Sequence, residues 1–153
     1  IDSGVDIIKV FESWAGLLEG DLYKKYVIEP NKEIAQQIKK YSPQTKQIFF
    51  PRGSKENYLN FIREIKPDVI SLDEEFPEKV FSYAKKNDII LQGNLKPTIL
   101  TEGGNKLKKG IKNVLNKFNK NKHIFNLSHG VLPQTPVENV QILVDTIRNN
   151  NET

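Results

Sequence analysis

Short apolar runs that end in small and polar residues limit the folds open to this chain more than any other sequence feature. Five such runs occur, at Ile7–Glu12, Gln47–Phe50, Val69–Leu72, Ile89–Leu91 and Ile124–Leu127. Each run is rich in Ile, Val or Phe and is bounded by polar residues, which predicts a buried strand. A buried strand with a polar tip is typical of a parallel sheet whose carboxyl edge carries functional side chains.

Amphipathic helical patterns fill the gaps between these runs. Apolar residues recur at spacings of three and four in residues 58–65 and 107–118, which predicts two helices with one buried face each. Ser54 is the predicted N-cap of the first of them. Residues 78–86 predict a shorter helix.

Proline marks the other two predicted helices. Residues 22–40 are expected to be helical with an interruption at Pro30, because proline cannot continue an unbroken α-helix. The last helix is expected to begin with Thr135 as N-cap and Pro136 at its first position, and Glu138 would complete a capping box.

This strand–helix alternation indicates a parallel α/β protein. A doubly wound sheet could hold five strands, whereas a (β/α)₈ TIM barrel needs eight strands and about 250 residues. Polar residues follow nearly every strand rather than one switch point, which favours the barrel. We therefore predict a TIM barrel of which residues 1–153, as the C-terminal portion of a single domain, supply roughly the last five β/α units.

Composition narrows the class of protein further. The chain of 153 residues lacks Cys and Met and starts at Ile1, so we expect it to lack an N-terminal part. Without Cys there is no disulfide framework and no thiolate metal site. No apolar run approaches about 20 residues, and no signal peptide is visible, so we expect a cytoplasmic protein without a membrane segment.

The net charge of +4 comes largely from lysines between positions 106 and 122. They predict a solvated helix face, because a nucleic-acid patch interleaves aromatic residues with basic ones. Only Phe118 lies among these lysines, at a core position of the helical pattern. We therefore expect no nucleic-acid partner, while a mildly positive field suits a polyanionic substrate.

The carboxyl ends of the predicted strands carry the candidate site residues. Ser13 is either a hydrogen-bond donor to a substrate oxygen or a cap for the next helix. His129 follows the last strand beside a glycine, and it is either a hydrogen-bond donor or proton shuttle at the site or a structural histidine. The remaining candidates are Trp14, Pro51, Arg52, Gly53, Asp73, Glu74, Gln92, Gly93, Asn94, Ser128 and Gly130.

The chemistry of these other candidates stays open at this point. Asp73 and Glu74 are acid–base groups, carboxylates that orient a neighbour, or charges at a helix N-terminus. Gln92 and Asn94 are expected to be orienting amides. With two histidines and no Cys, a zinc site is not expected.

Four blocks of these residues resemble the C-terminal part of the uroporphyrinogen decarboxylase family, in the same order and at the same spacing. The blocks are Phe11–Gly16, Ile48–Gly53, Leu91–Leu95 and Ile124–Gly130, the last followed by Pro133, Thr135, Pro136 and Glu138–Val140. The resemblance implies a (β/α)₈ barrel that forms a homodimer and needs no metal or organic cofactor. It also implies removal of CO₂ from the four acetate side chains of uroporphyrinogen III, which gives coproporphyrinogen III.

The resemblance assigns substrate contacts to Ser13 and His129, which match a hydroxyl and a histidine of the family. The family's arginine-rich substrate loop, key aspartate and substrate-contacting tyrosine would lie upstream of this chain. No catalytic residue is therefore assigned here, and the chain alone is expected to be inactive.

Three positions depart from the family pattern. The family usually has Gly at Ser128, Asp at Lys96 and Trp at Glu74. These departures leave open a different substrate or a lower activity.

Two alternatives to the decarboxylase remain. Corrinoid-linked methyltransferases of the same superfamily bind zinc through His and Cys, and the absence of Cys here argues against them. A basic module that binds RNA or other anions is the non-enzymatic alternative, and its mark would be strongly salt-dependent binding.

Overall fold

Five parallel strands form one sheet in the order β1-β2-β3-β4-β5. The computed structural model describes residues 1–150, so the last three residues of the predicted domain lie outside the described part. The strands are β1 (Ile7–Glu12), β2 (Lys46–Pro51), β3 (Val69–Ser71), β4 (Ile90–Leu95) and β5 (His123–Leu127). Within residues 1–150 the order never reverses, whereas a doubly wound sheet reverses at its switch point. This order is the one expected of a part of a barrel.

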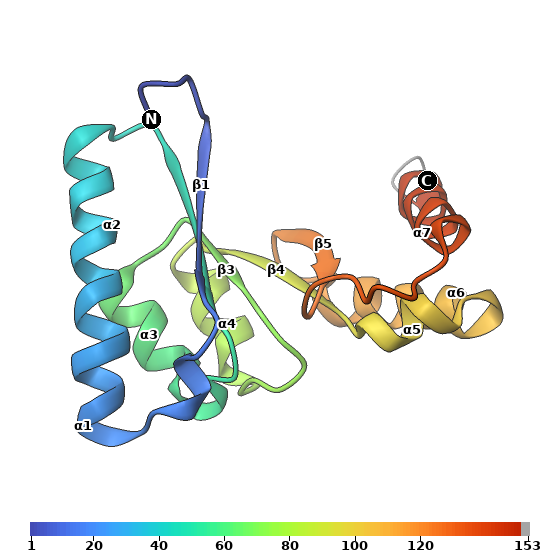
Figure 1. Cartoon of the computed structure of the whole chain (residues 1–153), viewed down its shortest axis with the longest axis horizontal. Coiled ribbons are helices and arrows are strands. Elements are labelled where there is room, and N and C mark those ends of the chain that lie inside the picture. The colour runs from blue at the N-terminus through green and yellow to red at the C-terminus, as the bar shows by residue number, and fades with distance from the viewer. Residues whose placement is uncertain (151–153) are drawn as a thin grey trace.

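Helices connect each strand to the next (Figure 1). The α-helices are α1 (Gly20–Tyr23), α2 (Glu29–Tyr41), α3 (Tyr58–Ile65), α4 (Lys79–Lys86), α5 (Pro97–Glu102), α6 (Gly104–Phe118) and α7 (Val137–Asn150). Single turns occur at η1 (Ala15–Leu17), η2 (Lys24–Ile28) and η3 (Lys55–Asn57). No described helix is both long and apolar enough to cross a bilayer.

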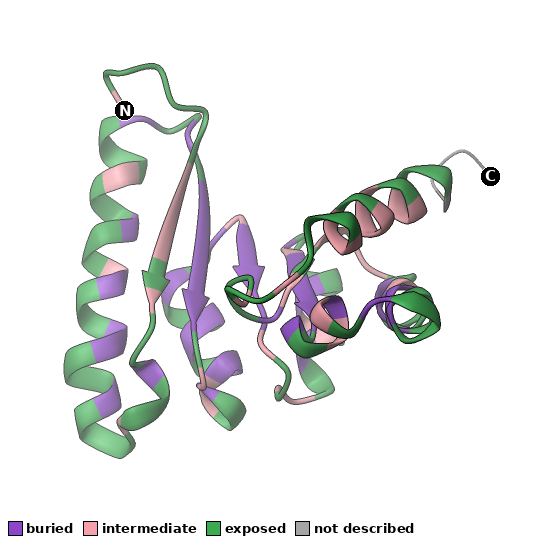
Figure 2. Ribbon diagram, turned by 45° about the vertical axis from the view of Figure 1, so that its right-hand side comes forward, coloured by how far each residue is buried: buried purple, intermediate pink, exposed green. Residues whose placement is uncertain are grey.

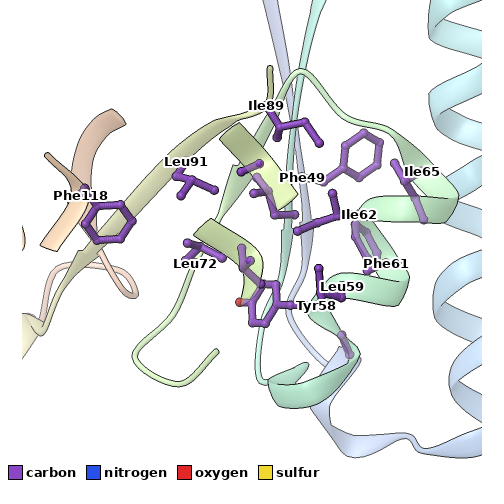
Figure 3. Close-up of a cluster of buried hydrophobic side chains, with 14 of the residues drawn as sticks. Phe49, Tyr58, Leu59, Phe61, Ile62, Ile65, Leu72, Ile89, Leu91 and Phe118 are labelled. Carbon is purple, nitrogen blue, oxygen red and sulfur yellow. The ribbon is translucent and has the colours of Figure 1, made fainter. Parts of the chain in front are cut away.

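The hydrophobic core lies between one face of the sheet and helices α2, α3, α4 and α6. Figure 3 shows Phe49 of β2 among side chains of α3, with Leu72 and Leu91 beside them. Buried residues accordingly follow the middle strands β2, β3 and β4 and the sheet-facing sides of the helices (Figure 2). The expectation that all five strands are buried is wrong for β1 and β5, which are only partly buried because they form the edges of the sheet. Because successive strand residues point to opposite faces, neighbours such as Phe50 and Ser71 lie on the other side, which we call the inner face.

The strand predictions are confirmed within one residue for four strands, but the predicted end of the fourth is wrong. β4 continues to Leu95, so Gln92 and Asn94 lie inside a strand rather than after it. Their backbones pair with Ile124 and Asn126 of β5. A ladder is made by backbone groups, so polar side chains can occupy it where the inner face offers them partners.

The predicted interruption at Pro30 is a change of helix type rather than a break. The π-helical turn η2 precedes α2, and the N–H of Glu29 donates to the carbonyl of Lys24. Pro30 then stands in the first turn of α2, where a missing N–H is tolerated. The amide of Asn31 donates to the carbonyl of Val27 at 2.8 Å, so a side chain satisfies a backbone acceptor at this junction.

Two predicted caps use their hydroxyls elsewhere. Ser54 precedes η3, but its side chain makes no cap hydrogen bond and instead lies 2.7 Å from the Tyr23 hydroxyl. The Thr135 hydroxyl lies 2.8 Å from that of Thr101, and α7 begins at Val137, one residue later than predicted. Both hydroxyls tie together elements that are distant in sequence, which local spacing cannot show.

Candidate active site

A cavity of about 400 Å³ opens on the inner face, at and below the carboxyl ends of the strands. We call it the inner-face cavity. It is lined by Lys9, Phe11, Ser13, Phe50, Arg52, Ser71, Asn126, Leu127, His129 and Gly130. The structure therefore brings Ser13 and His129, which are remote in sequence, to one cavity.

Ser13 and His129 are both exposed at the rim of this cavity. The alternative role of Ser13 as a cap is wrong, because Trp14 occupies the N-cap position of η1 and no side-chain cap bond forms. Neither side chain makes a hydrogen bond to another described residue. Both are therefore available to a bound molecule.

Two glycines hold the loops that carry Ser13 and Arg52. The N–H of Gly16 donates to the carbonyl of Arg52 at 2.9 Å. A Cβ at Gly16 would lie 2.5 Å from the carbonyl oxygen of Gly53, so only glycine permits this approach. Gly53 itself has a φ of +74°, in the left-handed region that favours glycine. The loops after β1 and β2 are thus locked together by backbone contact.

Positive charge lines the inner-face cavity without a carboxylate among its described lining residues. Arg52 is exposed there and forms no ion pair with a described residue. Lys9 is the second cation, and it was missed because it lies in the middle of a predicted strand. A lysine inside an apolar run is the sequence signal that could have found it.

Asp73 is held by backbone and side-chain groups beside a second cavity of about 270 Å³, which shares Arg52 and His129 with the inner-face cavity and is also lined by Glu74 and Glu75. The N–H of Gly53 donates to Asp73 Oδ2 at 2.5 Å, and Asn94 Nδ2 donates to the Asp73 carbonyl at 2.7 Å. Burial raises the pKa of Asp73, and the hydrogen bonds from the Gly53 N–H and from Tyr58 partly oppose the rise. The geometry favours the orienting role, because Asp73 fixes the loop after β2.

Gln92 and Asn94 both make side-chain hydrogen bonds of the kind expected of orienting amides. The Gln92 Oε1 accepts a hydrogen bond from Lys9 Nζ at 2.7 Å and another from the Ser71 hydroxyl. Lys9 belongs to β1 and Gln92 to β4, so this contact crosses the two strands between them. Three steps of about 4.8 Å would span about 14 Å on a flat sheet. The contact therefore fits a sheet that curves toward its inner face.

The three departures from the family pattern meet in space. Lys96 Nζ lies 3.0 Å from Glu74 Oε2, and the Ser128 hydroxyl donates to Glu74 Oε1 at 3.5 Å. These residues follow β4, β3 and β5 respectively, so one exposed carboxylate links three strand ends. The three positions at which a departure is expected therefore form one interacting group.

His123 and the lysines of α6 lie outside the inner-face cavity. His123 stacks on Phe118 with ring centroids 4.2 Å apart, and its Nε2 lies 2.5 Å from the Gly93 carbonyl oxygen. The lysines of α6 are exposed to solvent, as the sequence predicts. Among residues 1–150 no group of three or more His, Cys, Asp or Glu side chains could hold a metal ion.

A further hollow of about 380 Å³ lies between α2 and α3, where Gln47 and Asp68 mark the amino ends of the strands. It contains none of the predicted site residues. In parallel barrels chemistry resides at the opposite, carboxyl end, so we place the candidate site in the inner-face cavity.

The fold and this cavity define a parallel α/β protein with a cationic site at the carboxyl ends of its strands. Residues 1–150 match the sequence profile described as "Uroporphyrinogen decarboxylase (URO-D)". The chain belongs to the uroporphyrinogen decarboxylase family.

Individual relatives agree with the family match. Uroporphyrinogen decarboxylase of Rickettsia bellii is 44% identical over 149 residues, which are 97% of this chain and 43% of that protein. The enzymes so named from Rickettsia akari and Ruegeria pomeroyi are 39% and 36% identical over 95% and 97% of this chain. The chain thus spans less than half the length of these relatives, each of which it covers to 43%.

Proposed function

We propose that the full-length protein containing this chain converts uroporphyrinogen III to coproporphyrinogen III by removing CO₂ from four acetate side chains. One observation carries the proposal: in a member of this family, Ser13 and His129 line one cavity with Arg52, and the nearby carboxylates Asp73, Glu74 and Glu75 line the neighbouring cavity instead. Such a cavity suits a substrate that bears eight carboxylates. The corrinoid-linked and RNA-binding alternatives have no comparable support from the relatives.

For this decarboxylation the protein must bind the substrate and place charged and hydrogen-bonding groups around it. When CO₂ leaves an acetate group, its electron pair stays on the methylene carbon attached to the pyrrole. The ring accepts this pair if a ring carbon has first been protonated, and a proton then completes the methyl group. Organised donors around a polyanion can stabilise the charges that change along this path.

In the proposal, three side chains at the rim contact the substrate. The Ser13 hydroxyl and the His129 imidazole donate hydrogen bonds to substrate oxygens, since neither has a partner among the described residues. The Arg52 guanidinium adds positive charge beside them. We assign the proton donor to no residue of this chain.

The proposal extends to architecture and assembly. The sequential parallel order and the curvature toward the inner face support a (β/α)₈ barrel in which this chain forms the C-terminal part of a single domain. The protein would act as a homodimer in the cytoplasm, without a metal or an organic cofactor.

The test is anaerobic incubation of the full-length protein with uroporphyrinogen III, followed by separation of the products by number of carboxylates. We expect products with seven to four carboxylates to appear stepwise. No conversion by a folded protein would contradict the proposal.

The roles of Ser13 and His129 are tested by substitution in the same assay. Ser13→Ala and His129→Ala should each lower kcat/KM about 10- to 100-fold, because a hydrogen bond to a charged group contributes about 1.5–3 kcal/mol. Ser82→Ala is the matched control, since Ser82 is exposed on α4 and bonds only the Lys79 carbonyl. Unchanged kinetics in both site variants would contradict the assigned contacts.

A further inference from the structure

Lys9 is a cation on the inner face, inside the sheet rather than at its rim. It precedes Ser13 by four residues, about 13 Å along an extended strand. Lys9 lines the same cavity as Ser13 and His129. It therefore marks the floor of the inner-face cavity, while the residues that the family resemblance assigns lie at the opening.

The ammonium group of Lys9 is held by neutral groups. Its Nζ lies 2.7 Å from Gln92 Oε1 and 4.8 and 5.7 Å from the ring centroids of Phe11 and Phe50. The Ser71 hydroxyl donates to the same Gln92 oxygen, which fixes the amide with its oxygen toward Lys9. These contacts fix the position of the ammonium group in the inner-face cavity.

No described carboxylate balances this charge. Each ion pair formed by residues 1–150 involves another lysine, and no Asp or Glu is among the lining residues of the inner-face cavity. Lys9 is half-buried, and burial lowers its pKa. A half-buried cation is stabilised when an anion completes its surroundings.

We propose that Lys9 binds one carboxylate of the substrate at the floor of the inner-face cavity, with Gln92 and Ser71 as positioning residues. The inference rests on the proposed function, since it takes the ligand to be a polycarboxylate tetrapyrrole. Ser13 and His129 would contact the substrate at the rim, and Lys9 would engage a carboxylate that reaches into the barrel. Two separated anchor points would fix the orientation of the macrocycle.

The test compares Lys9→Met, Lys9→Gln and Lys9→Arg in the full-length protein. Lys112→Met is the matched control, because Lys112 is exposed on α6 and forms no ion pair with a described residue. Lys9→Met and Lys9→Gln should raise KM for uroporphyrinogen III about tenfold, with a smaller change in kcat, since they remove a charge-assisted hydrogen bond. Lys9→Arg should recover most of the affinity, and Lys112→Met should behave as wild type.

Two further readouts separate binding from a structural role. The wild-type KM should rise more steeply with salt than that of Lys9→Met, because one attractive charge is missing in the variant. The thermal midpoint of Lys9→Met should fall little, because methionine keeps the apolar stem against the two rings, and the loss of the hydrogen bond to Gln92 is offset by removal of a half-buried charge that no described carboxylate balances. A large fall in the midpoint with an unchanged salt dependence would assign Lys9 to structure and overturn the inference.

The outcomes also separate this inference from the proposed function. If wild type decarboxylates uroporphyrinogen III and both neutral variants keep its KM, the inference is wrong and the proposed function stands. If wild type neither binds nor converts uroporphyrinogen III, the proposed function falls and the inference falls with it.

Discussion

The two histidines of this chain, His123 and His129, are six positions apart and have opposite surroundings. His129 is exposed at the rim of the inner-face cavity, whereas His123 is stacked on Phe118 beneath the sheet. Burial lowers the pKa of His123, and the hydrogen bond with the Gly93 carbonyl opposes this in part. The residue type therefore does not tell which histidine is a candidate site residue and which one is structural. The packing around each ring makes this distinction.

The environment of His123 predicts how stability depends on pH. Below the unfolded-state pKa of about 6.5 the unfolded chain takes up a proton more readily than the folded one. The contribution of His123 is thus fully present above about 6.5 and is lost as the pH falls through the lower folded-state pKa. His123→Gln should flatten the fall in thermal midpoint between pH 7 and pH 5 in the full-length protein. Equal profiles for His123→Gln and wild type would contradict the prediction.

At the scale of elements, the ends of neighbouring strands are coupled. The loops after β1 and β2 are joined by the Gly16–Gly53 approach, and the ends of β3, β4 and β5 meet at Glu74. The departures from the family pattern at Lys96 and Ser128 both contact this carboxylate. Side chains that are far apart along the chain thus contact one another across the sheet.

This coupling predicts a non-additive pair of substitutions. Lys96→Asp restores the usual family residue but places it beside Glu74, so we expect a loss of about 0.5–1 kcal/mol, the range of exposed pairs. Adding Glu74→Trp, the usual family residue there, should remove the repulsion and recover this loss. Urea unfolding of the full-length single and double variants measures both values. Additive effects would contradict the coupling.

At the scale of the whole molecule, the sheet is open on both sides. Among residues 1–150 no further strand pairs with the outer edges of β1 and β5. Phe11 is 63% exposed and Ile7 54%, so apolar side chains of β1 face solvent. Unpaired edges and an exposed inner face are features that barrels remove by closing.

The open sheet predicts that the 153-residue chain associates with itself when it is produced alone. Light scattering after size exclusion should give a broad or high-mass distribution, because edge strands and apolar surface find partners in other copies. The full-length protein should give a single species under the same conditions. A monodisperse monomer of residues 1–153 with a cooperative thermal transition would contradict this prediction.

The sequence by itself determined the parallel α/β class, the positions of the strands and most helices, and a set of candidate residues at the strand ends, from which the family resemblance selected Ser13 and His129. It could do so because strands and helices follow from local periodicity, and because the carboxyl ends of parallel strands meet at one edge. Only the tertiary structure decided which polar groups converge. In the tertiary structure β4 includes Gln92 and Asn94, and Ser13 does not cap the next helical turn. Lys96 forms an ion pair with Glu74, and Lys9 lines the inner-face cavity. These contacts depend on strand register and sheet curvature, which relate residues from 22 to 83 positions apart and leave no trace in local spacing.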